Sequence, residues 1–280
     1  MGTQLEARRA GNLRGPMRPE RDNIAAPDLP EGIEWIGEPP RSMPVATAAG
    51  PVLVHFFDFA QLNSVRTLPY VSEWARRYAP HGLTTLGVQA PRFPFGAERD
   101  AVAAGLERLG IEFPVAIDAD RLLWHSYGCE GWPSLFLWKQ GGALGWAHFG
   151  EGEYQATEEA IQSELREQDA LRDLPAPMAP LRPGDAPDAR VIPPTPEFFP
   201  DENLAGPLEL PYEAGGAYAT VEGTGTLAFE LDGAPVNPVA IDGPALYTLT
   251  EHPKHESHTI AIQPSQGLRV HSISFAAGVP

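Results

Sequence analysis

A proline-dense segment divides this chain into two parts that cannot share one regular element. Eight prolines lie between Leu174 and Pro196. Proline lacks a backbone N–H and its ring clashes with the preceding helical turn, so neither a helix nor a central strand can cross such a segment. We therefore predict a semi-rigid, extended linker over residues 173–196. The 280-residue chain is long enough for one domain on each side of it.

Before the linker, apolar runs alternate with amphipathic stretches. Residues 51–57 (PVLVHFF) are β-branched and apolar, and a helical pattern follows a short connection. Residues 83–89 predict a second strand and residues 98–110 a helix, on the period of their apolar positions. Two later apolar runs surround a Gly-Gly turn, which predicts a β-hairpin. Strands that alternate with helices favour a mainly parallel sheet.

The connection after the first strand carries the tetrapeptide Gln61-Leu62-Asn63-Ser64. A helix N-terminus favours a thiolate and lowers the pKa of a cysteine, so a Cys-x-x-Cys pair would be well placed here. Neither Gln61 nor Ser64 offers sulfur. Because Cys129 is the single cysteine of the sequence, an intramolecular disulfide is also impossible. We predict that dithiol–disulfide exchange at this loop is absent.

These segments resemble the thioredoxin-like superfamily, and in particular the redoxin domains of the TlpA and DipZ type. Those domains carry CINCLRTLPY where this chain has QLNSVRTLPY at residues 61–70, and their FGEGxY recurs at residues 149–154. Residues 127–134 (YGCEGWPS) resemble the thioredoxin segment in which a cis-proline, here Pro133, faces the active-site loop. The resemblance implies an α/β thioredoxin-like fold, a mixed sheet flanked by helices, over residues 28–172.

Two further positions depart from the family pattern. The buried aspartate that serves many thioredoxins as proton acceptor falls at His55, and the aromatic residue before the motif is Phe57 rather than tryptophan. Loss of both sulfurs and of the proton acceptor indicates a site that no longer performs redox chemistry. We expect His55 to be a hydrogen-bonded core histidine.

Residues 197–280 predict an all-β sandwich, because short runs of alternating polarity lie between Gly, Pro or Asp turns. This part resembles the carbohydrate-binding-module-like domain that follows the thioredoxin domain in DipZ-type proteins. Three tyrosines could stack on sugar rings, although core packing is the stronger expectation for each: Tyr212, Tyr218 and Tyr247.

Net charge and hydropathy limit the kinds of partner and the cellular location that we expect. The net charge of −17 argues against nucleic acid and against an anionic membrane surface. Residues 1–27 are polar and predict a disordered tail, without the apolar stretch of a secretory signal. No window reaches the 18 apolar residues of a membrane span. We therefore expect a cytoplasmic protein, in contrast to the family's usual placement outside the cytoplasmic membrane.

Several reactive residue types have a simpler structural interpretation. Cys129 is expected to be inert packing, with a reactive thiol as the alternative. An acidic cluster predicts a solvated helix start: Glu151, Glu153, Glu158 and Glu159. Four histidines invite a metal interpretation, but Pro253 opposes the helix that would align three of them: His252, His255, His258 and His271. We expect no metal site and no cofactor.

The leading hypothesis is a non-catalytic binding or scaffolding protein without a redox dithiol. Its protein or peptide partner would lie at the cis-proline face, where strand addition to backbone is possible. The binding residues expected there are Phe57, Asn63, Trp132 and Pro133. One alternative is a peroxidase or reductase that acts through Cys129, and a second is glycan binding by the β-domain. The sequence leaves the partner's identity and the oligomeric state open.

Overall fold

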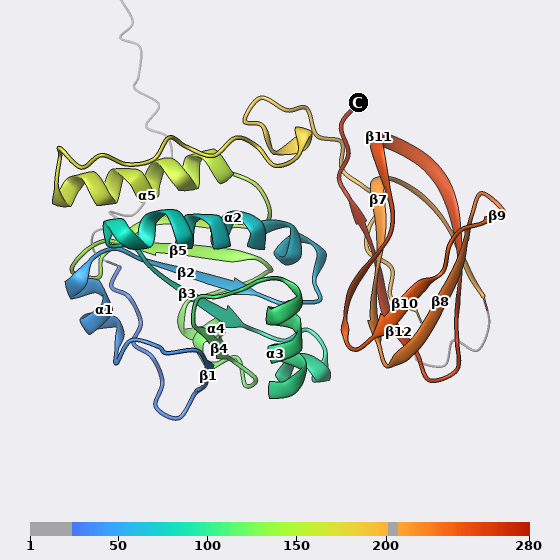
Figure 1. Cartoon of the computed structure of the whole chain (residues 1–280), viewed down its shortest axis with the longest axis horizontal. Helices are drawn as coiled ribbons and strands as arrows, with labels where there is room; N and C mark the ends of the chain where they lie inside the picture. Colours follow the sequence, from blue (N-terminus) through green and yellow to red (C-terminus); the bar gives the residue numbers. More distant parts are fainter. Residues whose placement is uncertain (1–23, 201–206) are drawn as a thin grey trace, which may run out of the picture.

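The computed structural model describes residues 24–200 and 207–280, and its N-terminal domain is built on one six-stranded mixed sheet (Figure 1). The strands are β1 (Glu34–Ile36), β2 (Val52–Phe57), β3 (Thr84–Gln89), β4 (Val115–Ile117), β5 (Ser134–Trp138) and β6 (Leu144–Phe149). Their order is β1-β4-β3-β2-β5-β6. Strands β2, β3 and β4 run parallel, whereas β1, β5 and β6 pair antiparallel with their neighbours.

Helices cover both faces of this sheet. They are α1 (Met43–Ala49), α2 (Leu62–Tyr78), α3 (Arg99–Arg108), α4 (Leu122–Ser126) and α5 (Tyr154–Gln168), with short 3-10 turns η2 (Ala79–His81) and η3 (Pro94–Ala97). Successive side chains of a strand point to opposite faces, so Val54 and Phe56 differ in their neighbours from Leu53 and Phe57. The first pair packs with α1 and α4, and the second with α2, α3 and α5. The predicted α/β thioredoxin-like fold is confirmed.

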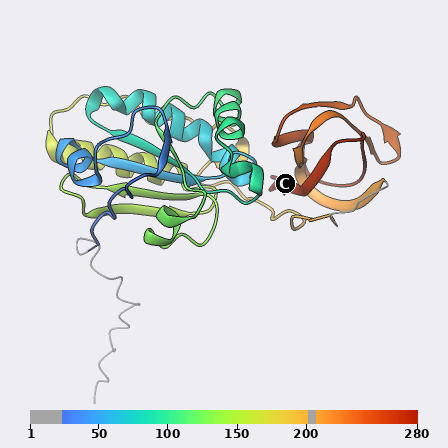
Figure 2. The same cartoon turned by 90° about the horizontal axis from the view of Figure 1, so that it is seen from below.

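The C-terminal domain is entirely antiparallel β-structure. Its strands are β7 (Leu208–Glu222), β8 (Thr224–Leu231), β9 (Ala234–Pro235), β10 (Val239–Asp242), β11 (Ala245–Pro264) and β12 (Arg269–Ala276). They are ordered β10-β8-β11-β7-β12, with β9 paired to β8. The long β11 pairs with β7 along most of its length and with β8 near its end, so the sheet curves around one apolar core (Figure 2). The predicted all-β, sandwich-like domain is confirmed.

The segment between the domains lies along the protein surface and contacts both domains. It contains the 3-10 turn η4 (Pro183–Asp185), and isolated bridges pair Ile192 with Gly278 and Phe198 with Ile273 of β12. Over residues 173–196 the structure has no α-helix and no strand of either sheet. The proline content did not reveal that this segment is docked, because docking depends on side chains distant in sequence.

The first described residues pair with the turn between β5 and β6. A disordered tail was predicted over residues 1–27. Of these, residues 1–23 lie outside the described residues, whereas residues 24–26 pair with this turn. There, Leu144 N–H donates to the Ile24 carbonyl at 2.9 Å and Ala26 N–H donates to the Gly142 carbonyl at 2.8 Å.

In the part of the chain that the structure describes, every helix is too short or too polar to cross a membrane.

Candidate functional site

The turn between β2 and α2 is closed by its own hydrogen bonds. Asp58 is fully buried, and its carboxylate accepts from Ala60 N–H at 2.7 Å and from Arg92 N–H at 2.6 Å. Burial raises the pKa of Asp58, and these two N–H groups oppose that rise. Gln89 Oε1 accepts from Phe59 N–H at 3.0 Å. The turn is therefore held from three sides before helix α2 begins.

Gln61 and Ser64 fasten the same turn to the helix. Gln61 is the N-cap of α2, and its side-chain oxygen accepts from Ser64 N–H at 2.7 Å. This bond satisfies one of the N–H groups that a helix start leaves without a partner. The Ser64 hydroxyl is buried and accepts from Asp58 N–H at 3.2 Å. At positions 61 and 64, where the family pattern has cysteines, each side chain accepts a hydrogen bond from a backbone N–H group.

His55 is buried without the hydrogen bonds that the sequence analysis expected. Neither of its ring nitrogens has a partner among the described residues. Its ring stacks on Phe57, with centroids 5.3 Å apart. Burial lowers the pKa of His55 to about 3, so the ring is neutral at physiological pH. The expectation of a core position was right and that of hydrogen bonding was wrong, because the side chains that pack over β2 here are apolar.

The four expected binding residues differ in accessibility. Phe57 is fully buried in the core beneath α2 and α3, so its side chain cannot contact a partner. Pro133 is also buried, and the Trp132–Pro133 peptide bond is cis. Trp132 is partly buried, with Nε1 donating to the Ala90 carbonyl at 2.8 Å and its ring 4.5 Å from that of Trp124. Asn63 is partly exposed at the first turn of α2.

The β-domain packs directly against this turn. Leu62 is 3% exposed and forms an apolar cluster with Tyr218, Leu246 and Ala276 of the β-domain. The Thr220 hydroxyl donates to the Ala60 carbonyl at 2.7 Å in a buried hydrogen bond. One face of the turn therefore lies against the second domain rather than against solvent.

Two arginines extend the contact between the domains. The two terminal guanidinium nitrogens of Arg92 donate to Glu197, at 3.2 and 2.8 Å, and Ser274 of β12 donates to the same carboxylate at 2.9 Å. Arg108 of α3 pairs with Asp242 of β10 at 2.9 Å. These contacts join residues from five segments, so they set the orientation of the β-domain as well as its position.

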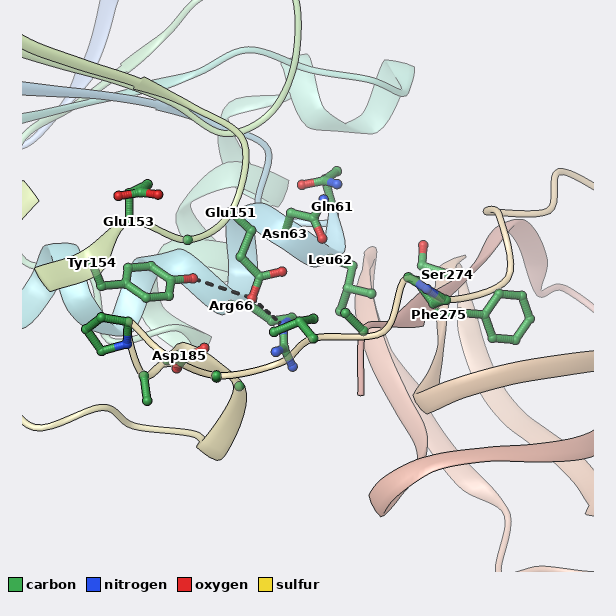
Figure 3. Close-up of a pocket in the computed structure, with 18 of the residues that line it drawn as sticks. Gln61, Leu62, Asn63, Arg66, Glu151, Glu153, Tyr154, Asp185, Ser274 and Phe275 are labelled. Atoms are coloured by element: carbon green, nitrogen blue, oxygen red, sulfur yellow. Dashed lines mark hydrogen bonds and ion pairs between the residues drawn. The ribbon is translucent and has the colours of Figure 1, made fainter. Parts of the chain in front are cut away.

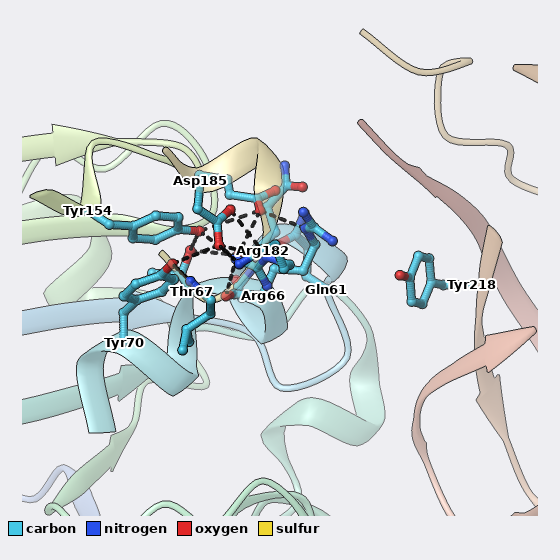
Figure 4. Close-up of polar contacts among 12 residues, drawn as sticks. Gln61, Arg66, Thr67, Tyr70, Tyr154, Arg182, Asp185 and Tyr218 are labelled. Carbon is cyan, nitrogen blue, oxygen red and sulfur yellow. Dashed lines mark hydrogen bonds and ion pairs between the residues drawn. The ribbon is translucent and has the colours of Figure 1, made fainter. Parts of the chain in front are cut away.

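A second polar network joins the linker to the starts of α2 and α5, and we call it the clasp (Figure 4). It comprises Arg66, Thr67, Tyr70, Glu151, Tyr154, Arg182 and Asp185. Its first half is within the N-terminal domain. Arg66 Nε lies 2.6 Å from Glu151 Oε1, and the rings of Tyr70 and Tyr154 stack at 3.8 Å with 9° between their planes.

The second half of the clasp comes from the linker. Asp185 accepts from the Tyr70 hydroxyl at 2.7 Å, and the same hydroxyl accepts from Leu181 N–H at 2.6 Å. Arg182 pairs with Asp185 at 2.9 Å and donates to the Arg66 carbonyl at 2.9 Å. Burial raises the pKa of Tyr70 to about 12, so its hydroxyl stays protonated and keeps donating.

From the sequence, the clasp residues of the N-terminal domain were recognised as parts of the family motifs, and Glu151 also as part of the acidic cluster. The RTLPY and FGEGxY motifs supply five of its members, and the structure shows that the two motifs meet in space. The contribution of Arg182 and Asp185 was missed. The available signal was one arginine and one aspartate, three residues apart, inside a proline-rich segment.

A cleft of about 820 Å³ opens beside the turn, the clasp and β12 (Figure 3). The first turn of α2 contributes Gln61, Asn63 and Arg66, and the start of α5 contributes Glu153 and Glu159 to the lining. The linker and β12 form the remaining walls, so both domains contribute residues to it. The cleft therefore exists only because the β-domain is docked.

Cys129 and the three candidate tyrosines do not line this cleft. Cys129 is 7% exposed within the core beside α4, and burial raises its thiol pKa to about 12, which agrees with inert packing. Tyr212 and Tyr218 are 3% and 6% exposed, so neither presents a ring face to solvent. The hydroxyl of the third tyrosine, Tyr247, donates to Asp242 at 2.9 Å.

The acidic cluster at the start of α5 is only partly solvated, which corrects the expectation from sequence. Glu153 and Glu159 are exposed, but Glu158 is 2% exposed. The Glu158 carboxylate accepts from the Tyr78 hydroxyl at 2.6 Å and from Met178 N–H at 2.8 Å. Glu158 and the clasp residue Glu151 thus tie elements together: helix geometry turns Glu158 inward, and Glu151, in the loop before α5, pairs with Arg66.

The sheet order and the closed turn at the head of α2 define a thioredoxin-like protein with an appended β-domain. Comparison with known proteins agrees: the chain is 27% identical to protein DipZ of Mycobacterium bovis over 297 aligned residues, covering 89% of this chain and 42% of DipZ. NHL repeat-containing protein 2 of Gallus gallus is 30% identical over 135 residues, covering 48% of this chain and 18% of that protein. The chain thus spans less than half the length of these relatives.

Solved structures with a thioredoxin-like fold align with about half of the chain. The thioredoxin-like superfamily protein SPOA0173 has a TM-score of 0.46 at 20% identity, covering 54% of this chain and 99% of that one. A putative thiol:disulfide interchange protein DsbE from Chlorobium tepidum has a TM-score of 0.43 at 21% identity, covering 50% and 95%. No protein-family model matches the chain.

Proposed function

We propose that this chain is a non-catalytic thioredoxin-like protein that lacks the redox dithiol and binds a protein or peptide segment in the cleft beside its closed turn. The observation that carries the proposal is the state of Gln61 and Ser64. Both side chains are hydrogen-bonded to backbone, so neither is available as a nucleophile, while an open cleft of about 820 Å³ adjoins them. The site is built to hold a ligand without reacting with it.

The chemistry of the lining favours a segment that carries basic side chains. The cation of Arg66 is neutralised by Glu151 at 2.6 Å, which leaves the exposed carboxylates of Glu153 and Glu159 on the rim. Apolar surface from the linker, including Val191, faces the same cleft. Complementary charge steers a partner and fixes its register, while apolar contacts contribute affinity. A peptide that alternates Lys or Arg with apolar residues fits this surface.

The cis-proline face offers fewer accessible side chains for a partner than the sequence predicted. Phe57 and Pro133 are buried, so partner contact there is limited to backbone and to Trp132. The loop that follows β6 links this face to the cleft, because Gly150 N–H donates to the Pro133 carbonyl at 2.8 Å and Glu151 comes next. Asn63 is the expected binding residue that lines the cleft.

The test uses a random-peptide display library against the full chain. We expect wild-type protein to enrich peptides with basic residues, and Asn63→Trp to lose that enrichment because the indole fills the cleft. Gln140→Trp is the matched control, since Gln140 is exposed on the turn between β5 and β6. Equal enrichment by both variants, or none by wild type, would reject binding in this cleft.

The absence of catalysis is tested separately by insulin reduction and by peroxide consumption. We expect wild type and Cys129→Ser to be equally inactive in both assays, because the chain holds no dithiol and the Cys129 thiol stays protonated. Turnover by wild type that Cys129→Ser abolishes would instead support the thiol enzyme.

A further inference from the structure

The β-domain holds a group of side chains that the proposed binding site does not use. His252, Glu256 and His258 each offer a possible metal ligand, and the three ligand atoms lie within 4.8 Å of one another. All three belong to β11 and lie at a register shift in its pairing with β7. Glu251 pairs with Gly216, and the next paired residue of β11, Glu256, pairs with Ala214, so β11 contains extra residues at this point. The bulge brings His252 beside residues that regular strand spacing would carry away from it.

The hydrogen bonds of the two imidazoles leave one nitrogen of each for a metal. His258 Nδ1 lies 2.7 Å from Asp232 Oδ2, and a carboxylate can only accept, so this nitrogen carries a proton. His258 Nε2 then faces Glu256. His252 Nε2 lies 2.8 Å from the Tyr212 hydroxyl, which leaves His252 Nδ1 free. A carboxylate or hydroxyl that orients a histidine through its second nitrogen is the usual outer shell of a metal site.

The spacing suits a small divalent cation. Two ligands at about 2.0 Å from a tetrahedral zinc ion lie about 3.3 Å apart. His258 Nε2 and Glu256 Oε2 are 3.2 Å apart without any movement. The two imidazole rings stack with centroids 4.3 Å apart and 23° between their planes, so the His252 ring must turn for its nitrogen to face an ion held by His258 and Glu256.

Access and charge also favour a cation. His258 lines a surface hollow of about 400 Å³ together with Tyr212 and Asp232. The carboxylates of Asp232 and Glu256 lie on either side of the His258 ring, 2.7 Å from Nδ1 and 3.2 Å from Nε2. A cation at Nε2 would therefore lie next to negative charge that favours it.

We propose that His252, Glu256 and His258 form a binding site for a divalent transition-metal cation in the β-domain, with Asp232 and Tyr212 as its outer shell. Two imidazoles and one carboxylate are a ligand set typical of zinc, with a fourth position left to water or to a ligand. This proposal departs from the expectation of no metal site, which rested on helical spacing; here a strand bulge brings His252 and His258 together.

The role of His255 distinguishes this site from a simple row of regularly spaced histidines. His255 lies midway between His252 and His258 in sequence, yet it is not one of the three residues that converge. The proposal therefore requires that His255→Gln bind zinc like wild type, whereas His252→Ala and His258→Ala do not.

The experiment titrates metal-free full chain with zinc chloride against a chromophoric chelator. We expect one bound equivalent for wild type and for His255→Gln, a loss of at least about tenfold in affinity for His258→Ala and Glu256→Gln, and about 10- to 100-fold for Asp232→Asn. Calcium and magnesium chloride should not compete, since these cations prefer all-oxygen sites.

Circular dichroism establishes that each variant is folded. If an alanine variant does not fold, Asp232→Asn carries the test, because it removes the charge of the outer shell and keeps its shape. Absence of a stoichiometric zinc ion in wild type would overturn the proposal. So would equal affinity in wild type and His258→Ala, or a loss in His255→Gln as large as in His258→Ala.

Discussion

At His55 the fold buries an imidazole among apolar neighbours and gives it no hydrogen bond from the residues that the structure describes. The sequence predicted its burial, because the flanking run is apolar on both sides. It could not predict the missing partner, which depends on side chains that other elements place over β2. An unpartnered buried ring pays a desolvation cost whenever it must ionise.

His55 therefore makes stability depend on pH. Its pKa falls from 6.5 to about 3 on folding, so the unfolded chain binds the additional proton between these values and the folded state loses stability as the pH falls below 6.5. We expect wild type to lose about 1.4 kcal/mol more than His55→Leu between pH 7.5 and pH 5.5. Urea unfolding at the two pH values measures this. Equal pH dependence in both proteins would contradict it.

Cys129 gives the second prediction for a single residue. Burial raises its thiol pKa from 9.0 to about 12, which lowers the thiolate fraction at pH 8 by about three orders of magnitude. We expect iodoacetamide to alkylate the folded chain about 1,000-fold more slowly than the chain in guanidinium chloride. Mass spectrometry follows the reaction, and similar rates in both conditions would show an accessible, reactive thiol.

Single elements were predicted well where one local pattern dominates. Strand β2 and the β5–β6 hairpin are present at the expected positions because continuous apolar runs mark buried strands, and helix α3 because its apolar residues recur at helical spacing. The linker shows where such reasoning ends. Proline content excluded regular structure there, but docking rests on Tyr70 and Asp185, which are 115 residues apart, and no local pattern encodes that contact.

The clasp should therefore protect the linker from proteases. Tyr70→Phe removes the hydroxyl that binds both Asp185 and Leu181, at a cost of about 1–3 kcal/mol. We expect trypsin to cleave this variant faster than wild type after Arg190, as measured by mass spectrometry of timed digests. Tyr247→Phe is the matched control, since it loses comparable bonds within the β-domain. Unchanged cleavage in Tyr70→Phe would mean that the clasp does not hold the linker.

Across the whole molecule, the two domains were predictable one by one but their arrangement was not. The β-domain rests on the turn at the head of α2 through Leu62, Thr220 and the Arg92–Glu197 pair. Each contact joins residues from different segments, and an arginine or leucine in sequence carries no sign of its partner. The candidate cleft was missed for the same reason, since it arises only when the domains meet.

Thr220 tests this arrangement. Thr220→Val keeps the shape of the side chain and leaves the buried Ala60 carbonyl without its donor, which costs about 1–3 kcal/mol. We expect faster amide hydrogen exchange over residues 58–64 in this variant. Thr226→Val is the control, because Thr226 is exposed in the same domain. Identical exchange in the two variants would argue that the domains are not held together at this point.

The fastening of Gln61 and Ser64 has one more consequence. A turn closed by a carboxamide and a hydroxyl has the same shape in glutathione-rich and in oxidising surroundings, because neither group gains or loses electrons there. A ligand in the neighbouring cleft therefore contacts a surface whose shape does not depend on the electrochemical potential of its compartment.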